Sequence, residues 1–438
     1  MKQVRIGMIG LGSVGQAVAR ILMEDGSTLE GRAGAPLALT KVAVSDLKKK
    51  REVSLDPSLL TTDPFEVVNS PEVDIVVEVM GGENPAFDLA MAAARKRKGF
   101  VTANKLLLAL RGAEVYEAFE KSGARLGFEA AVAGAIPIIR SIREGFAGDR
   151  IELVQGIING TGNYILSRMT GEGSRFEDVL KDAQALGYAE ADPTLDVEGI
   201  DSAHKIAVLA AIAFQTVVDF EDVYTEGITR ITPEDIDSAR DLGYRIKLLA
   251  IAQRIGETIS LRVHPAMLPE RHFLANVNGP FNAVETYGKR AGVNMLVGRG
   301  AGGGPTASAV MGDVMAMARD IASGAIVSRF APLGAPMAAM KKLAHAPMEE
   351  LCSEYYLRFT VLDKPGVLAI IAGALGAHNI SIASMIQRGR MENQPVSVVI
   401  MTHDAVEESM KNALERIEKQ GVLVAPPMLI RIAADGKD

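Results

Sequence analysis

The feature that most constrains the fold is a glycine-rich turn, GLGSVG at residues 10–15, between two segments of different periodicity. Residues 4–9 alternate around β-branched side chains, and apolar residues then recur at helical spacing from residue 17 to 22, which predicts strand, turn and helix. In this context Gly10 permits a tight turn, Gly12 lets the backbone approach a pyrophosphate, and Gly15 lets the helix pack closely. The first helical turn, with Ser13 and Val14, presents unpaired N–H groups to the phosphates. The segment therefore predicts a dinucleotide-binding turn.

A second predicted strand, residues 39–44, ends at Ser45 and Asp46, and we expect residues 26–36 before it to form an inserted loop. In dinucleotide-binding sheets an acidic residue at this position hydrogen-bonds the ribose 2′-OH of NAD, whereas basic residues nearby favour the 2′-phosphate of NADP. Asp46 is followed by three lysines and an arginine at residues 48–51, so both signals are present. Asp46 is also a common turn residue. The choice of cofactor stays open, and we favour NADP.

Two further apolar strands are predicted at residues 74–79 and 100–103, with a helix at about 85–98 between them. Nearly continuous apolar strands are typical of a parallel sheet that is covered on both faces, so the N-terminal third predicts a Rossmann-type α/β fold. Ligands of such sheets bind beyond the carboxyl ends of the strands. Lys105 follows the strand at 100–103 and is a candidate site residue, although by itself such a lysine is as often an ordinary surface residue.

Composition excludes several classes of function. The chain has 47 basic and 54 acidic residues, a formal net charge of −7, and so offers no general field that attracts nucleic acid or an anionic membrane. No segment is apolar over the length that a bilayer requires, and the first residues lead directly into a strand instead of a secretory signal. The single cysteine, Cys352, excludes an intramolecular disulfide and a thiolate zinc site, and it fits a reducing compartment. We expect a cytoplasmic protein.

Several long motifs in the first three quarters of the chain carry a family resemblance. They are VMGG (79–82), ANK (103–105), FEAAVAGAIP (128–137), NGTGNYIL (159–166), LGYAEADP (186–193), DVEGIDSAHK (196–205) and GAGGGPTASAV (300–310). Over about residues 1–330 they closely resemble homoserine dehydrogenase. The resemblance implies reversible NAD(P)-dependent interconversion of L-homoserine and L-aspartate 4-semialdehyde, in the biosynthesis of threonine, methionine and often isoleucine. It also implies a homodimer or homotetramer.

Asp201 and Lys205 lie four residues apart at the start of an apolar segment, residues 202–214, that predicts a helix. On a surface helix this spacing gives an ordinary ion pair worth a few tenths of a kcal/mol. This helix is too apolar for the surface, so we expect the pair to face an enclosed site, where a lysine can exchange a proton near neutrality. We assign Lys205 as the proton donor to the carbonyl oxygen and Asp201 as the group that positions it. Lys105 would approach the same oxygen or the nicotinamide ribose, and His204, on another side of the helix, would only pack.

The resemblance also implies residues that bind the substrate. Glu190 is suited to pairing with the substrate ammonium in a charge-assisted hydrogen bond, and Gly187 brings the backbone close. Asp196 is expected to support the amine or the lysines. For Asp192, a purely structural role is open, in which it caps the turn before Pro193.

Two loops without regular patterning complete the expected site. In the resembled family the first, at residues 129–136, binds a monovalent cation, usually sodium, mainly through backbone carbonyls, which are hard ligands suited to such ions. Carried over residue by residue, the ligands are Glu129, Val132, Gly134 and Ile136. The second loop is the glycine cluster at residues 298–304, where the backbone of Gly302 would contact the nicotinamide end. A helix at 307–321 would then return the chain to the cofactor domain; the alternative is a plain hinge.

Residues 331–348 are expected to form a linker. After it, the pattern predicts strands at 355–361, from 379 onward, at 395–402 and at 427–432, and helices at 367–377 and 405–420. The order βαββαβ is ferredoxin-like. The pattern DKPGVLAxIAxxLxxxNISI, from residue 363, resembles an ACT domain, a module that commonly binds amino acids. We expect Asp363, Gly366 and Asn379 near an effector such as threonine. The alternative is an ACT pair that only dimerises.

The predicted architecture is therefore α/β with three modules. They are a Rossmann-type NAD(P)-binding domain (1–135 plus about 300–340), an α+β catalytic and dimerisation domain (136–299) and a ferredoxin-like ACT domain (350–432). Two other functions compete with small-molecule dehydrogenation. Acylating aldehyde dehydrogenase chemistry needs a thiol nucleophile, and Cys352 lies far in sequence from every site motif. A non-enzymatic nucleotide and amino-acid sensor would not need Lys105, Glu190, Asp201 and Lys205 together.

Overall fold

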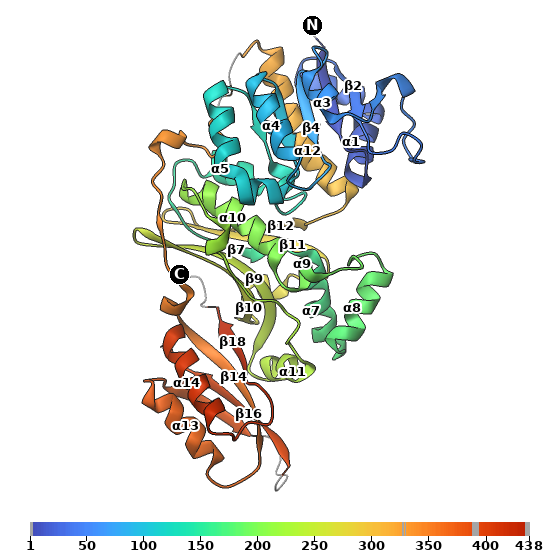
Figure 1. The fold of residues 1–438 in the computed structure, drawn as a ribbon. Coiled ribbons are helices and arrows are strands. Elements are labelled where there is room, and N and C mark those ends of the chain that lie inside the picture. The colour runs from blue at the N-terminus through green and yellow to red at the C-terminus, as the bar shows by residue number, and fades with distance from the viewer. Residues whose placement is uncertain (1–2, 326–327, 329, 388–393, 434–438) are drawn as a thin grey trace.

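The computed structural model describes residues 3–325, 328, 330–387 and 394–433. Figure 1 shows three bodies stacked along the long axis of the molecule, which we call the N-terminal, central and C-terminal domains. The N-terminal domain lies at one end and the C-terminal domain at the other, so the central domain contacts both. No helix of the described residues is long and apolar enough to cross a membrane.

A parallel sheet of six strands forms the middle of the N-terminal domain, in the order β3-β2-β1-β4-β5-β6. This order is that of a dinucleotide-binding sheet, which confirms the predicted Rossmann-type fold. The strands are β1 (Val4–Ile9), β2 (Leu37–Ala43), β3 (Leu60–Thr61), β4 (Ile75–Glu78), β5 (Gly99–Thr102) and β6 (Leu126–Gly127). On one face lie α1 (Ser13–Glu24) and α12 (Gly303–Ala322), and on the other α3 (Pro64–Asn69), α4 (Ala86–Arg95) and α5 (Lys105–Ser122).

One local prediction in this domain was wrong. Residues expected to form an inserted loop before β2 instead form a helix, α2 (Gly26–Ala33), which buries Leu29 and Ala33 and ends at Gly34 in the left-handed conformation. The helix is weakly amphipathic and rich in small and polar residues, so its sequence does not favour a helix. Its packing against α12, which arrives from residue 303 onward, stabilises it instead.

The central domain is built on antiparallel strands in the order β12-β11-β7-β9-β10. They are β7 (Ile151–Ile157), β9 (Tyr244–Ile255), β10 (Thr258–Pro269), β11 (Phe281–Gly288) and β12 (Gly292–Arg299). The apolar helix α10 (Ile200–Phe214) packs against β7, β9 and β10 and is buried almost throughout, as its composition predicts. Around it lie α7 (Gly160–Glu172), α8 (Phe176–Ala185), α9 (Thr194–Val197) and α11 (Pro233–Asp241).

The C-terminal domain has the predicted βαββαβ order, with its sheet in the order β18-β14-β16-β15. Its elements are β14 (Cys352–Leu362), α13 (Val367–Ala377), β15 (Ile382–Gln387), β16 (Pro395–Thr402), α14 (Glu407–Lys419) and β18 (Met428–Ile432). Strand β18 pairs with β10 through Ala266 and Arg431, so the sheets of the two domains are continuous. The sequence did not predict this continuity.

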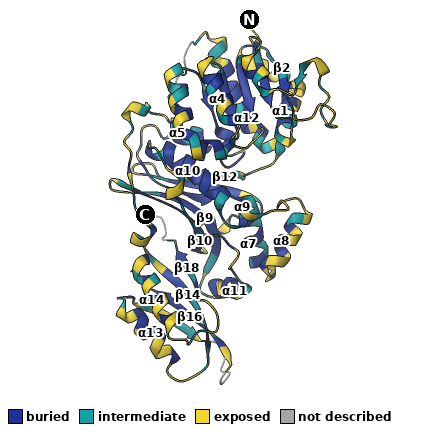
Figure 2. Cartoon of the chain, in the orientation of Figure 1, coloured by how far each residue is buried: buried dark blue, intermediate teal, exposed yellow. Residues whose placement is uncertain are grey.

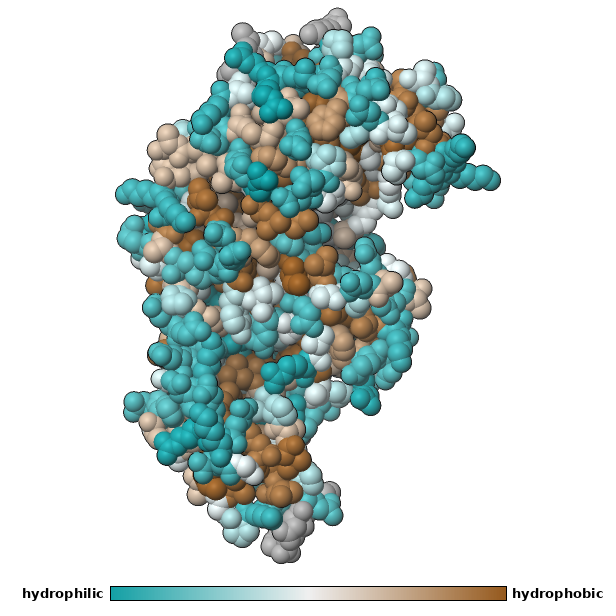
Figure 3. All heavy atoms as spheres, viewed as in Figure 1, coloured by the Kyte–Doolittle hydropathy of each residue, from teal (hydrophilic) through white to brown (hydrophobic). Residues whose placement is uncertain are grey.

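Burial follows the sheets and the helix between them. Figure 2 shows buried residues along the strands of all three domains and along α10, whereas the outer helices alternate buried and exposed positions. Figure 3 shows hydrophilic side chains over much of this face, with hydrophobic ones also gathered over the C-terminal domain, where α13 exposes Leu368 and Ile370. Helix α10 is therefore enclosed, and it packs against α5 of the N-terminal domain.

Candidate active site

The glycine turn between β1 and α1 has the geometry that its sequence predicts. Gly10 has a φ of 102°, and a Cβ there would lie 2.8 Å from the carbonyl oxygen of Val79. A Cβ at Gly15 would overlap the carbonyl oxygen of Gly10, whereas one at Gly12 would meet nothing within 4 Å. The turn is therefore closed on the protein side and open at Gly12, where the first turn of α1, with Ser13 and Val14, offers unpaired N–H groups. These features fit a bound dinucleotide.

A cavity of about 430 Å³ adjoins this turn, and Lys49 and Arg51 line it together with Gly10 and Gly12. Asp46 is not among the lining residues. Its carboxylate accepts a hydrogen bond from the backbone of Lys48 at 2.8 Å, and its carbonyl accepts one from the Arg51 side chain. Asp46 thus serves the turn that its sequence also allowed, and the basic residues Lys49 and Arg51 line the cavity.

A buried carboxylate that sequence reasoning did not single out organises the ends of β4 and β5. Glu78 is fully buried; it accepts hydrogen bonds from the backbone N–H groups of Met80 and Gly81 and from the Thr102 hydroxyl at 2.6 Å. Thr102 in turn accepts from the backbone of Asn104, which caps α5 immediately before Lys105. An acidic residue inside an otherwise apolar strand was the signal that could have identified it.

Two lysines from different domains converge on one buried aspartate. Lys205 donates to Asp201 Oδ2 at 2.5 Å and to the Ile158 carbonyl at 2.8 Å. Lys105, at the start of α5, lies 2.9 Å from the other carboxylate oxygen, Oδ1. The side chains of Asp201 and Lys205 are 7% and 11% exposed, whereas Lys105 is 39% exposed, so this lysine borders the opening of the site.

The charges of this cluster determine its protonation. Burial would raise the pKa of Asp201, but Lys205 and Lys105 together hold it well below its usual range. Burial lowers the pKa of Lys105, yet Asp201, Asp196 and Glu190 outweigh it and raise that pKa. Asp201 is thus an anion at neutral pH, held between the two lysine side chains.

A second carboxylate, Asp196, joins the cluster through Asn159, whose amide donates to Asp196 Oδ1 at 2.7 Å and to Asp201 Oδ2 at 2.9 Å. Burial and the charge of Asp201 raise the pKa of Asp196, which hydrogen bonding to Asn159 opposes. Sequence reasoning assigned no role to Asn159. The available signal was a polar residue directly beyond the carboxyl end of the buried strand β7.

The other substrate-binding candidates lie on an exposed loop between α8 and α9. Glu190 and Gly187 are both exposed, and the charge of Glu190 reaches Lys105. Asp192 accepts hydrogen bonds from the backbone and the hydroxyl of Thr194, which is the capping role expected of it. His204 stacks on Phe220 with ring centroids 4.5 Å apart, so it packs as expected and does not join the lysines.

The segment expected to hold a cation forms a short 3₁₀ turn at Glu129–Ala131 and then an irregular loop. The Glu129 carboxylate is buried and accepts from the backbone N–H groups of Ile139 and Arg140 at 2.8 and 3.0 Å. Burial and the neighbouring Asp313 raise its pKa to about 7. In the described part of the chain, no group of three or more His, Cys, Asp or Glu side chains could hold a metal ion.

Val132, Gly134 and Ile136 follow in this loop. Gly134 and its neighbour Ala133 both have left-handed backbone conformations, with φ of 55° and 54°, and a Cβ on Gly134 would overlap backbone atoms of residues 299–300. Consecutive left-handed residues turn successive carbonyls in directions that regular structure does not allow. The Ile136 carbonyl accepts a hydrogen bond from the backbone of Ile138.

The second glycine loop ends at Gly302, which has a φ of 117° and is the N-cap of α12. A Cβ on the next residue, Gly303, would lie 3.0 Å from the Ser13 carbonyl, so the first turns of α12 and α1 meet beside the glycine turn. The helix predicted at 307–321 exists and shares a hydrophobic core with β1 and α1.

In the C-terminal domain, Asp363 and Gly366 line a cavity of about 320 Å³, together with Lys364 and Gln387. Asn379, which has a φ of 60°, is not among its lining residues. Cys352 is an exposed free thiol at the start of β14, in a different domain from the lysines, so no thiol is available for acylating chemistry at the cluster.

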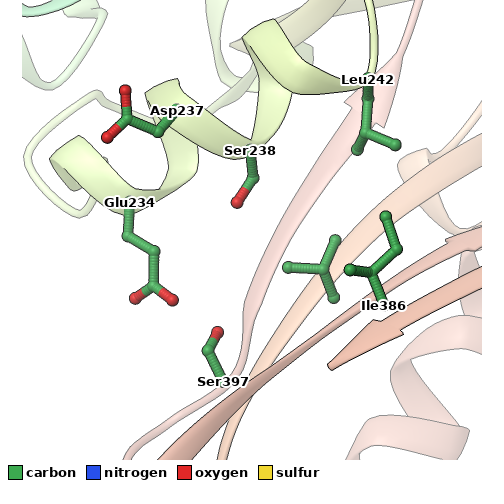
Figure 4. Close-up of a pocket in the computed structure, with 7 residues that line it drawn as sticks. Glu234, Asp237, Ser238, Leu242, Ile386 and Ser397 are labelled. Carbon is green, nitrogen blue, oxygen red and sulfur yellow. The ribbon is translucent and has the colours of Figure 1, made fainter. Parts of the chain in front are cut away.

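Figure 4 shows a further cavity, of about 290 Å³, at the junction of the central and C-terminal domains. Glu234, Asp237, Ser238 and Leu242 reach it from α11 and the residue that follows the helix, and Ile386 and Ser397 from the opposite sheet. None of the lysine–aspartate cluster lines this cavity.

Comparisons with known proteins agree with this arrangement. The family model for homoserine dehydrogenase matches residues 137–315, that for the homoserine dehydrogenase NAD-binding domain matches residues 10–129, and that for the ACT domain matches residues 355–422. A homoserine dehydrogenase of Neisseria gonorrhoeae is 43% identical to this chain, and the alignment covers 99% of each of the two chains. One of Bacillus subtilis is 39% identical, and the alignment covers 100% of each. The crystal structure of a homoserine dehydrogenase from Thiobacillus denitrificans superimposes with a TM-score of 0.93 at 44% identity, covering 99% of this chain and 98% of that one. The chain therefore belongs to the homoserine dehydrogenases, NAD(P)-dependent oxidoreductases that act on a CH–OH group, and it carries a C-terminal ACT domain.

Proposed function

We propose that Lys205 is the acid–base residue in the interconversion of L-homoserine and L-aspartate 4-semialdehyde. The observation that carries the assignment is the sharing of one buried carboxylate, Asp201, by two lysines from different domains. An ammonium has three N–H donors, and Asp201 and Ile158 engage two of those of Lys205. The third N–H is left for a substrate oxygen.

In the direction of reduction, Lys205 gives a proton to the aldehyde oxygen, and in oxidation the neutral amine takes the hydroxyl proton back. A nicotinamide held beside the cluster would supply the hydride, or in oxidation accept it, at the carbon that bears this oxygen. Lys105 remains charged because its pKa is raised, so it stabilises negative charge that develops on the same oxygen or contacts the nicotinamide ribose. Asp201 holds both lysines in place.

The substrate ammonium requires anionic partners, and we assign Glu190 and Asp196 to it, with the backbone at Gly187 beside them. Glu190 is exposed and its charge reaches Lys105, so it borders the entrance to the cluster. Asp196 is linked to Asp201 through Asn159. These carboxylates would pair with the substrate ammonium, and the lysines would face its reacting oxygen.

For the cofactor, we propose NADP in preference to NAD. Lys49 and Arg51 line the cavity beside Gly12 and would hold the 2′-phosphate, whereas Asp46, which could accept from a 2′-OH, does not line it. Gly10, Gly12, Ser13, Val14 and Gly15 would hold the pyrophosphate, and Gly302 the nicotinamide end.

We also propose that the loop at residues 129–136 binds a monovalent cation, with sodium as the expected ion. The ligands would be Glu129 and the backbone carbonyls of Val132, Gly134 and Ile136. The two consecutive left-handed residues support this assignment, since they turn carbonyls of the loop in directions that regular structure does not allow. Such an ion would fix the loop that leads from the N-terminal domain into the central domain.

The C-terminal domain suggests regulation. We propose that an amino acid, with threonine as the first choice, binds near Asp363 and Gly366, as feedback on threonine, methionine and isoleucine biosynthesis; Asn379, beyond the other end of α13, does not line this cavity. A threonine titration of both activity and thermal stability tests this; no response in either measurement removes it.

We further propose a homodimer or homotetramer. The family resemblance implies such an assembly, and light scattering measures the mass.

The decisive experiment follows homoserine oxidation at the nicotinamide absorbance, with NAD and NADP in parallel. We expect reduction of both cofactors, with a higher kcat/KM for NADP. Absence of homoserine-dependent reduction with either cofactor, in the presence of sodium, contradicts the proposed reaction. A preference for NAD would leave the reaction standing and overturn the cofactor assignment.

A further inference from the structure

The dipeptide Ile158–Asn159, directly beyond the end of β7, contacts every charged group of the cluster in the central domain. Ile158 accepts a hydrogen bond from Lys205 at 2.8 Å through its carbonyl oxygen. The Asn159 amide nitrogen donates one hydrogen bond to Asp201 and one to Asp196, at 2.9 and 2.7 Å. Asn159 is 5% exposed, so these bonds are shielded from water.

We propose that Asn159 is a positioning residue for the reaction: it joins Asp196 and Asp201 into one hydrogen-bonded pair. The inference rests on the proposed roles of Asp201, Asp196 and Lys205. Asn159 is assigned no contact with the substrate or the cofactor; it acts through the two carboxylates.

The chemistry of a side-chain amide explains why this residue type suits the position. Two neighbouring carboxylates repel each other, and the charge of Asp201 indeed raises the pKa of Asp196. An NH₂ group has two donors and offers one to each carboxylate without adding a charge. A lysine here would also bridge the two, but its charge would compete with Lys105 and Lys205 for Asp201.

The orientation of the amide is determined by a third bond. The Asn159 side-chain oxygen accepts from the backbone N–H of Gly162 at 2.7 Å and caps α7. A flipped amide would direct its oxygen at two carboxylates and its NH₂ group at an N–H donor, which would lose all three hydrogen bonds. Helix α7 therefore fixes which atom faces the cluster.

The capping role and the bridging role can be separated by substitution. In Asn159→Ser the hydroxyl can still accept from the first turn of α7, because serine is as good an N-cap as asparagine, but it is too short to bridge both carboxylates. In Asn159→Asp the cap and shape remain, whereas both donors become acceptors and a third negative charge enters. Asn276→Ser is the matched control, since exposed Asn276 also donates two amide hydrogen bonds, to Glu270 and His272, away from the cluster.

We expect Asn159→Ser to lower kcat/KM for homoserine at least about 10-fold, the scale of one hydrogen bond to a charged group. Its KM for NADP should stay close to that of the parent, and its thermal midpoint should fall only modestly, because the cap of α7 is kept while two buried hydrogen bonds are lost. Because Asn159 lowers the pKa of Asp196, the acidic limb of the kcat/KM profile should move to higher pH by about one unit. Asn159→Asp should be more severe, and Asn276→Ser should match the parent in all four measurements.

Two outcomes overturn the inference while leaving the proposed function intact. One is a parental kcat/KM and pH profile in Asn159→Ser. The other is a lowered thermal midpoint with a parental pH profile, which would leave Asn159 as a helix cap only. If Lys205→Ala retains its turnover, the acid–base assignment itself fails, and that result is independent of both Asn159 variants.

Discussion

Lys105 Nζ lies 2.9 Å from Asp201 Oδ1, and this ion pair crosses from the N-terminal domain to the central domain. Lys105 is the first residue of α5 and Asp201 lies in the first turn of α10, and the two helices pack against each other. The pair therefore does two things at once. It sets how the cofactor-binding sheet faces the central domain, and it places a second ammonium beside Lys205.

The first prediction concerns proton transfer. Lys205→Ala should lower kcat at least about 100-fold in both directions, the usual scale of a general acid–base contribution. NADPH binding, followed by nicotinamide fluorescence, should be unchanged because the turn at residues 10–15 is untouched. Lys121→Ala, at an exposed position of α5, is the control and should keep full turnover. Near-parental turnover in Lys205→Ala would exclude the assignment.

The second prediction concerns stability and pH. The folded-state pKa of Asp201 is depressed, so its stabilising contribution is present above its unfolded pKa of about 3.9 and is lost as the pH falls further toward the folded value. At pH 7, Asp201→Asn should lower the free energy of unfolding by about 3 kcal/mol, since it removes one partner of a buried ion pair. Urea denaturation should show this difference unchanged from pH 8 to about 5 and shrinking below pH 4. A difference that stays constant to pH 3 would contradict the argument.

The third prediction separates the residues of the basic run after β2. Arg51→Ala and Lys49→Ala should each raise KM for NADP about 10-fold and leave KM for NAD within twofold, because loss of one charge-assisted hydrogen bond to phosphate is of that size. Lys50→Ala is the matched control: it lies in the same run but does not line the cavity. Equal effects of all three variants would point to a diffuse field instead of a phosphate site.

The fourth prediction concerns the junction between the central and C-terminal domains. Asp235 is fully buried; it pairs with Arg358 at 2.7 Å, accepts from the Tyr356 hydroxyl and completes the capping box of α11. Asp235→Ala should lower the free energy of unfolding by about 3–5 kcal/mol, because it removes the buried carboxylate that bonds Arg358 and Tyr356 and leaves Arg358 only the more distant, exposed Glu234 as an acidic partner. Asp237→Ala, two residues away in an exposed pair with Arg240, should cost less than about 1 kcal/mol. Similar losses in the two variants would refute the distinction between buried and exposed pairs.

Local patterns predicted most of the elements. The strand at residues 4–9 and the strand at 395–402 have the predicted bounds, and the helix at 367–377 does as well. Each is marked by the periodicity of its hydrophobic residues or by a glycine at its boundary, and both signals depend only on residues a few positions apart. The helix α2 was missed for the converse reason, since α12, far along the chain, stabilises a segment that has weak helical preference of its own.

The sequence by itself determined the turn that holds a dinucleotide, the α/β class and the Asp201–Lys205 pair, because a glycine turn and an i,i+4 spacing are local geometry. Only the tertiary structure decided that Lys105 meets that pair, that Glu78 and Asn159 organise the strand ends around it, and that β18 extends the central sheet. These contacts join residues far apart in the chain. They form only when strands and helices pack, since burial is what makes a shared carboxylate, a bridging amide or a strand edge stable against competition from water.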